Sequence, residues 1–239
     1  MLATYSSVTR ADENRRYAER QQLTISSWVV HIDKEIVNAD PELAKRAMES
    51  LEQCLDDITK VVPTEAIKKL KAVPLYISQP YPGTAPKAEY HPSGDWLREN
   101  GRDPKMAKAV EFTNLEIFED ELIRMPWFVL HELAHAYHDQ QLPDGFGNSE
   151  IKANFHRVKS DGLYDTVERK LGRNRNNVFE PAYGLTNPME FFAEASESYF
   201  GINDFAPFNR KELEALDPKT AEMIRRAWSV REEDHLTPK

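Results

Sequence analysis

The sequence predicts an α+β fold, in which a small twisted mixed sheet is followed by a helical C-terminal half. Short β-branched and apolar runs lie in the first half of the chain, whereas apolar residues at helical spacing dominate the second half. The chain has 239 residues, of which 40% are hydrophobic and 30% are charged, so it can bury a substantial core. We therefore expect one domain over residues 1–239, with an α/β part at about 23–141 and a helical part at about 149–239.

The individual elements follow from local signals along the chain. Residues 9–22 are polar and are expected to form a surface helix, and the alternating residues 24–32 a strand. Asp40-Pro41-Glu42 combines an N-cap, a first-position proline and a first-turn acid, which predicts a helix to about Val62. Further strands are expected at 73–78, 88–91 and 109–114, and further helices at 117–123, 126–141, 149–159, 187–200, 210–216 and 218–229.

Composition narrows the possible partners. The net charge of −9 argues against a nucleic-acid partner, and the locally basic residues 170–175 are interpreted as a solvated loop. No apolar run approaches the length of about 18 residues that a membrane span needs. The single cysteine, Cys54, excludes an intramolecular disulfide and a thiolate cage, so any metal site must use His and carboxylate ligands. The N-terminal residues do not have the pattern of a signal peptide.

The pentapeptide His-Glu-Leu-Ala-His at 131–135 is the most informative motif. On a helix, His131 and His135 project from one face and can bind one zinc ion, while Glu132 is rotated by about 100° and can take a proton from water. Met125-Pro126 marks the start of this helix, and Pro143-Asp144-Gly145 follows its end. The alternative interpretation is an amphipathic helix with two incidental histidines.

A catalytic zinc usually has three protein ligands, so a third is required. The longer motif that continues with a glycine and then a histidine is excluded, because the chain has His138 and Gln141 at those two positions. The segment 187–200 instead predicts a helix, with Asn187 as its N-cap and Pro188 at its start. Glu190 is then a candidate ligand, and Glu194, one turn later, can accept the N–H of a ligand imidazole. The alternative is that Glu190, Glu194 and Glu197 form a solvated helix face.

Residues 131–136, HELAHA, and 182–195, AYGLTNPMEFFAEA, resemble the catalytic domain of anthrax lethal factor and its relatives, including the Pro-Pro endopeptidases. The resemblance implies a zincin-like metallopeptidase fold of the gluzincin type, with Glu190 as the third zinc ligand and Glu194 as a supporting carboxylate. It also implies that the Tyr183 hydroxyl donates to the developing oxyanion. Ala88, Glu89, Tyr90 and His91 resemble the family's edge strand, against which the substrate is laid, although His91 fits a plain surface histidine better.

These observations predict an endopeptidase that binds one Zn²⁺ per chain, uses Glu132 as general base and acts on a peptide or protein substrate. Two alternatives remain open: a peptidase that needs a free terminus, and a zinc-stabilised binding protein without catalysis. Glu132 and Tyr183 argue against the latter, because zinc binding needs neither of them. The chain is expected to be a monomer. The resembled family is largely exported, which favours an extracellular or periplasmic location over a cytoplasmic one.

Overall fold

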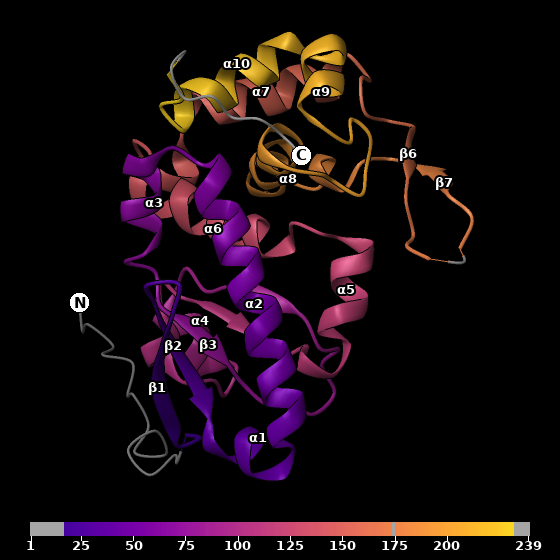
Figure 1. The fold of residues 1–239 in the computed structure, drawn as a ribbon. Coiled ribbons are helices and arrows are strands. Elements are labelled where there is room, and N and C mark those ends of the chain that lie inside the picture. The colour runs from indigo at the N-terminus through magenta and orange to yellow at the C-terminus, as the bar shows by residue number, and fades with distance from the viewer. Residues whose placement is uncertain (1–16, 174, 232–239) are drawn as a thin grey trace, which may run out of the picture.

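The computed structural model describes residues 17–173 and 175–231 and has the expected α+β arrangement (Figure 1). A mixed sheet has the strand order β1-β2-β3-β5-β4. Its strands are β1 (Arg20–Ile25), β2 (Trp28–Asp33), β3 (Leu75–Ile77), β4 (Ala88–Tyr90) and β5 (Val110–Phe112). Strands β2, β3 and β5 are parallel, whereas β1 and β4 run antiparallel to their neighbours. The predicted edge position of residues 88–90 is confirmed.

The start of the sheet differs from the prediction. Residues 24–32 were expected to form one strand, but Ser26 and Ser27 have φ values of 46° and 71° and turn the chain between β1 and β2. Two successive positive φ angles give the tight hairpin turn that Asn-Gly usually forms, and Ser-Ser does not signal it. Residues 20–22 therefore lie in β1 rather than in the predicted helix 9–22. Residues 9–16 of that prediction lie outside the described residues.

Five α-helices accompany the sheet in the first part of the chain: α1 (Lys34–Ala39), α2 (Pro41–Val61), α3 (Thr64–Leu70), α4 (Gly94–Glu99) and α5 (Phe118–Arg124). Helix α2 begins as predicted, because the Asp40 carboxylate accepts a hydrogen bond from the Leu43 N–H at 2.9 Å and Pro41 follows the cap. Cys54 is partly buried on α2 against the core, and burial raises the pKa of its thiol to about 12. Cys54 is therefore a packed residue.

The second part contains the predicted helices, α6 (Phe128–Gln141), α7 (Ser149–Ser160), α8 (Pro188–Phe200), α9 (Arg210–Leu216) and α10 (Pro218–Ala227). It is not wholly helical, since β6 (Val167–Arg169) and β7 (Val178–Glu180) form an antiparallel hairpin that projects from the helices (Figure 1). Each of these strands has three residues, too few to show a period in the sequence. The short 3₁₀ helices are η1 (Pro104–Met106), η2 (Leu115–Ile117), η3 (Gly145–Gly147) and η4 (Tyr183–Leu185).

Helix α6 lies between the sheet and the C-terminal helices (Figure 1). It contacts β4 and β5 on one side and α8 on the other, and buried residues from β1 to the end of the described chain belong to one apolar core. The Trp228 ring, just after α10, stacks on Tyr137 of α6 with centroids 4.0 Å apart and on Phe192 of α8 at 6.0 Å. This aromatic stack holds α6 and α8 together away from the sheet.

A second contact joins the start of α6 to the end of α8. The indole ring of Trp127 packs directly on the backbone of Gly201, and a Cβ atom added to Gly201 would overlap that ring.

No helix in the described part of the chain is long and apolar enough to cross a membrane.

Candidate metal centre

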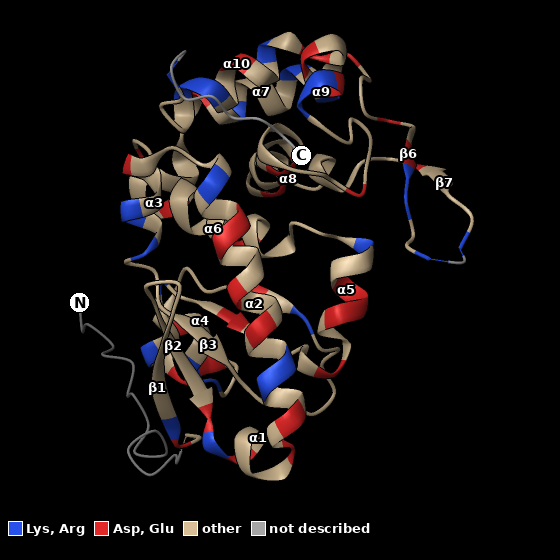
Figure 2. Ribbon diagram, in the orientation of Figure 1, with Lys and Arg blue, Asp and Glu red and all other residues tan. Residues whose placement is uncertain are grey.

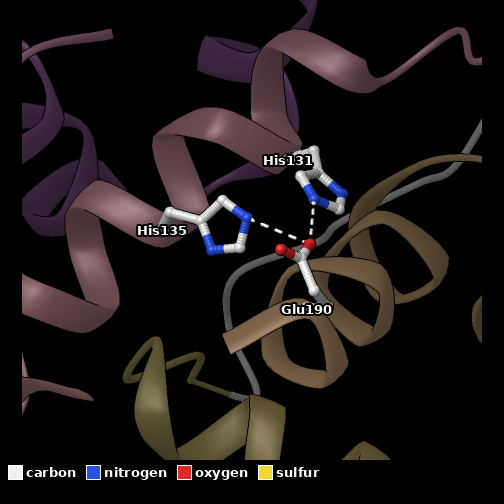
Figure 3. A group of neighbouring side chains, drawn as sticks. All are labelled: His131, His135 and Glu190. Carbon is white, nitrogen blue, oxygen red and sulfur yellow. Dashed lines mark hydrogen bonds and ion pairs between the residues drawn. The ribbon is translucent and has the colours of Figure 1, made fainter. Parts of the chain in front are cut away.

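Three side chains from α6 and α8 converge at one point (Figure 3). The Nε2 atoms of His131 and His135 lie 2.9 and 3.3 Å from Oε2 of Glu190. One donor atom from each residue falls within 4.8 Å of the other two. These three residues could therefore hold a metal ion, and they are the three that the sequence predicted.

Helix α6 places the two histidines one turn apart on its inner side. Their ring centroids are 4.8 Å apart and the ring planes are nearly perpendicular, at 81°. Every residue from Phe128 to His138 is buried except Glu132, which is half-buried. The helix is therefore held by packing nearly all round and presents one polar residue, Glu132, to the space beside the histidines.

Helix α8 begins with the predicted cap. The Asn187 side chain accepts hydrogen bonds from the N–H groups of Met189 and Glu190 at 2.9 and 3.0 Å, and Pro188 occupies the first turn. The cap fixes the first turn of α8 and hence the position of Glu190, which points toward the imidazoles (Figure 3). A carboxylate is also favoured in the first turn by the helix dipole.

The carboxylate that contacts an imidazole of the cluster is Glu197 and not Glu194. Oε1 of Glu197 lies 2.7 Å from Nδ1 of His131, and the Glu197 side chain is 1% exposed. This contact orients the ring and leaves Nε2 free to face the cluster. The predicted contact of Glu194 with an imidazole is wrong, because the crossing of α8 over α6 brings the second turn after Glu190, rather than the first, beneath His131. The spacing of Glu197, seven residues after Glu190 on the same helix face, was the available signal.

Glu194 supports the neighbouring turn instead. Its Oε2 accepts a hydrogen bond from the Gly184 N–H at 3.1 Å, and Gly184 directly follows Tyr183 in η4. Burial, aided by the negative charge of Glu197, raises the pKa of Glu194 to about 8. Glu194 and Glu197 are both buried, so the alternative of a solvated acidic face on α8 is wrong.

The cluster is strongly polarised. Burial alone would lower the pKa of His131, but its hydrogen bonds with Glu190 and Glu197 raise that pKa well above the ordinary value. Burial opposes ionisation of Glu190 as well, yet contacts with His131 and His135 hold the pKa of its carboxyl well below the usual range. The carboxylates of α8 thus favour positive charge at the point where the histidines meet.

Glu132 contacts the edge strand. Its Oε2 accepts a hydrogen bond from the Tyr90 N–H at 2.8 Å. His91 and Lys87 form their backbone bonds toward β5, so the backbone groups of Ala88 and Tyr90 point to the open edge of β4. The Glu132 carboxylate is therefore held between the histidine pair and the edge of the sheet.

The side chains of β4 are fixed by polar contacts away from this edge. The Tyr90 hydroxyl donates to Asp139 at 2.6 Å, and Glu89 pairs with Arg102 at 2.6 Å. His91 was assigned to the edge strand as a surface or substrate-facing residue, and this is wrong. It is 2% exposed and its Nε2 lies 2.8 Å from the buried Glu111 carboxylate, because alternation along the strand turns it away from the cleft.

Tyr183 flanks the cluster on the other side. Its ring centroid is 6.5 Å from that of His131, and 48% of the residue is exposed. Burial and the charge of Glu190 raise the pKa of its hydroxyl, which keeps the proton on the oxygen at neutral pH. Tyr183 can therefore donate a hydrogen bond to a molecule beside the cluster.

His138 has a packing role. It is 0% exposed and lies between Phe146 and Phe192, with ring centroids at 5.1 and 5.0 Å. Burial lowers the pKa of His138 to about 4, so the ring is neutral.

A cavity of about 500 Å³ covers the cluster. It is lined by the three candidate ligands, by Glu132 and Tyr183, and by residues of β4, the α5–α6 junction and η3, including Ala88, Tyr90, Met125, Phe128 and Phe146. Met125 follows the end of α5 and Phe128 is the first residue of α6, whereas Phe146 packs beside the second half of α6. The cavity therefore runs along α6, with the histidines between its two ends.

Comparisons of the chain with family models, with curated proteins and with solved structures found no match. The similarity of residues 131–136 and 182–195 to lethal-factor-type peptidases therefore stays a prediction.

Proposed function

We propose that this chain is a zinc-dependent endopeptidase. The observation that carries the proposal is the convergence of His131, His135 and Glu190 within 4.8 Å, beneath a cavity that also contains Glu132 and the open edge of β4. Two imidazoles and one carboxylate are a ligand set that catalytic zinc uses, with a fourth position left for water or substrate. The contact of Glu197 with Nδ1 of His131 also directs Nε2 toward the cluster, as a metal bound there would require.

A bound zinc ion would supply a Lewis acid and lower the pKa of a water molecule from about 15.7 towards 7. Glu132 would accept a proton from the attacking water and pass it to the leaving amine, the role of a general base that then acts as an acid. Its hydrogen bond with the Tyr90 N–H holds the carboxylate in place for this transfer. Tyr183 would donate its hydroxyl to the oxyanion that forms at the substrate carbonyl.

The open edge of β4 supports an extended polypeptide as the substrate. A peptide can add to a sheet edge by main-chain hydrogen bonds that do not depend on its sequence. The backbone groups of Ala88 and the Tyr90 carbonyl point to that edge, where the Tyr90 N–H already donates to the proposed base, Glu132. An extended substrate laid there would bring its main chain next to Glu132.

The charged groups of the cavity favour internal cleavage over recognition of a chain end. Among the described residues that line the cavity, each Lys or Arg is paired with a carboxylate. The pairs are Lys87 with Glu89, Arg124 with Glu121 and Asp204, and Arg169 with Asp204 and Glu180. A substrate C-terminus would therefore meet no unpaired cation, and the cavity continues past the cluster in both directions along α6.

The test is cleavage of a diverse peptide library, read by mass spectrometry, with zinc-loaded wild type beside Glu132→Gln. Internal cuts that the variant makes at a rate lower by about 10²–10⁴ are expected, with zinc content unchanged, because the variant loses only proton transfer. Cuts confined to peptide ends would replace the proposal with a terminus-dependent peptidase. If neither protein cuts any peptide while both retain zinc, the chain would be a metal-binding protein without catalysis.

A further inference from the structure

The loop of the β6–β7 hairpin begins at the wall of the cavity. Arg169, the last residue of β6, lines the cavity together with Asp204, and the Lys170 N–H donates to the Asp204 carbonyl at 2.8 Å. A Cβ added to Gly172 would lie 3.7 Å from Cα of Arg124, so the loop passes against the end of α5. From there it extends away from the body of the molecule (Figure 1).

This loop, residues 170–177, carries only basic charges. Lys170, Arg173 and Arg175 are exposed, and Figure 2 shows blue segments and no red one in the described part of the loop. Within the described ranges, neither Arg173 nor Arg175 forms an ion pair, unlike Arg169 at the base of the hairpin. The chain as a whole has a net charge of −9. The loop is therefore a cationic feature that no carboxylate of the described chain neutralises.

The loop lies close enough to the cavity to contact a polypeptide that is bound there. Arg173 is four residues beyond Arg169, a span of at most about 14 Å even in extended chain. A polypeptide that leaves the cavity past Arg169 would reach the loop after about four extended residues. At the cavity wall, Arg124 and Arg169 are paired with carboxylates. Farther along the loop, Arg173 and Arg175 form no ion pair with a described residue.

We propose that the described residues of this loop, 170–173 and 175–177, form a docking site for an acidic segment of the polypeptide substrate, located a few residues away from the scissile bond. The inference rests on the proposed function and deepens it by naming a substrate class. Charge complementarity is the recognition principle, and it acts on binding and on the rate of encounter more than on the chemical step.

A protein segment fits this surface better than an anionic membrane does. Membrane docking by a basic element requires apolar side chains that insert beside the charges. Leu171 is the one apolar side chain in the sequence of residues 170–177, and it is partly buried. Phe179 is 71% exposed, but it stands alone on β7, outside the loop.

The experiment measures capture of two matched peptide libraries by zinc-loaded Glu132→Gln protein, which binds without cutting. Both libraries share the same random cores, and a short spacer joins each core to a polyglutamate or a polyglutamine tail at either end. At low salt we expect the polyglutamate library to be enriched about fivefold, the size of a few exposed ion pairs, and the enrichment to fall with added salt. The further changes R173Q/R175Q should abolish it.

A control variant, K211Q/K219Q, removes the same charge from exposed sites on α9 and α10 and should retain the enrichment. The reversal R173E/R175E should shift the preference to a polylysine tail. Equal capture of the two libraries by the parent protein, or enrichment that survives R173Q/R175Q, would overturn the proposal.

One result would favour a membrane instead: phosphatidylserine vesicles bind the parent protein but not R173Q/R175Q, and the two peptide libraries are captured equally. That result would overturn the proposal. Cleavage of the same libraries by the wild type separates the two proposals. Enrichment without any cleavage would disprove the peptidase and leave the docking site standing.

Discussion

Helices α6 and α8 both contribute to the candidate metal centre, but they hold their polar residues in different ways. On α6, His131 and His135 are brought together by the helix repeat itself, and Glu132 is set apart by the same repeat. On α8, the three carboxylates at Glu190, Glu194 and Glu197 have three different partners. These partners are the histidine pair, the Gly184 N–H and the His131 Nδ1. One helix supplies a motif, whereas the other supplies contacts that exist only in the folded chain.

The difference shows which part of a metal site is local. The pair on α6 needs only a helix, whereas the carboxylates of α8 act through the crossing of two helices. Substitutions on α8 should therefore separate the roles of its three carboxylates, and substitutions on α6 and η4 should separate metal binding from catalysis.

The largest effect on the metal is expected for Glu190→Ala. This change removes one of three ligands and should weaken zinc binding by more than the roughly 10–100-fold that is typical for loss of an outer hydrogen-bond partner. Zinc content after dialysis against a graded chelator is the measurement. Retention equal to that of the wild type would mean that α8 supplies no ligand.

Tyr183→Phe tests the residue that lies next to the site without belonging to either helix. We expect a fall of about 10²–10³ in kcat, because one oxyanion donor is lost, with KM and zinc content little changed. Peptide turnover and metal analysis of the same preparation check this. An unchanged kcat would remove Tyr183 from the mechanism.

Glu197→Gln and Glu194→Gln are a matched pair, since both carboxylates are buried on α8 and lie within one turn of each other. Glu197→Gln should weaken zinc binding by about 10–100-fold, because the imidazole loses its carboxylate partner. Glu194→Gln should leave zinc affinity near the wild-type value, since its carboxylate contacts the Gly184 N–H. Equal losses in a zinc titration would show that the two carboxylates are not distinguished as described.

The smallest effect concerns stability, at the contact of His138 with Phe192 of α8. The folded-state pKa of His138 is lowered from 6.5 to about 4 by burial. Its stabilising contribution is therefore fully present above pH 6.5 and is lost as the pH falls towards 4. Between about pH 6 and pH 5, the free energy of unfolding of the wild type should fall by about 1 kcal/mol more than that of His138→Leu. Urea unfolding of both metal-free proteins at these pH values measures it, and parallel losses would contradict a neutral buried ring.

The same contrast explains how far the sequence predicted the molecule. The pairing of His131 with His135 on one helix, the cap at Asn187 and the start of helix α2 were predicted correctly, because each depends on residues within a few positions of one another. Metal binding by these histidines with Glu190 stays a prediction. Glu197 was missed and Glu194 misassigned, since the choice between them depends on the angle at which α8 crosses α6. His91 was misplaced for a similar reason, as its side depends on the register of β4 with β5. The turn at Ser26-Ser27 was missed because its backbone angles are not the preferred ones for serine.

The contact between Trp127 and Gly201 has a consequence for how the site can change. The ring fills the space that any side chain at position 201 would need, so the separation of the two helices is set there by an aromatic ring against bare backbone. The distance between the histidines of α6 and the glutamate of α8 is thus limited by a contact that includes none of these three residues. A larger residue at position 201 would push the two helices apart and increase the distance between the histidines and Glu190, although all three candidate ligands would remain in the sequence.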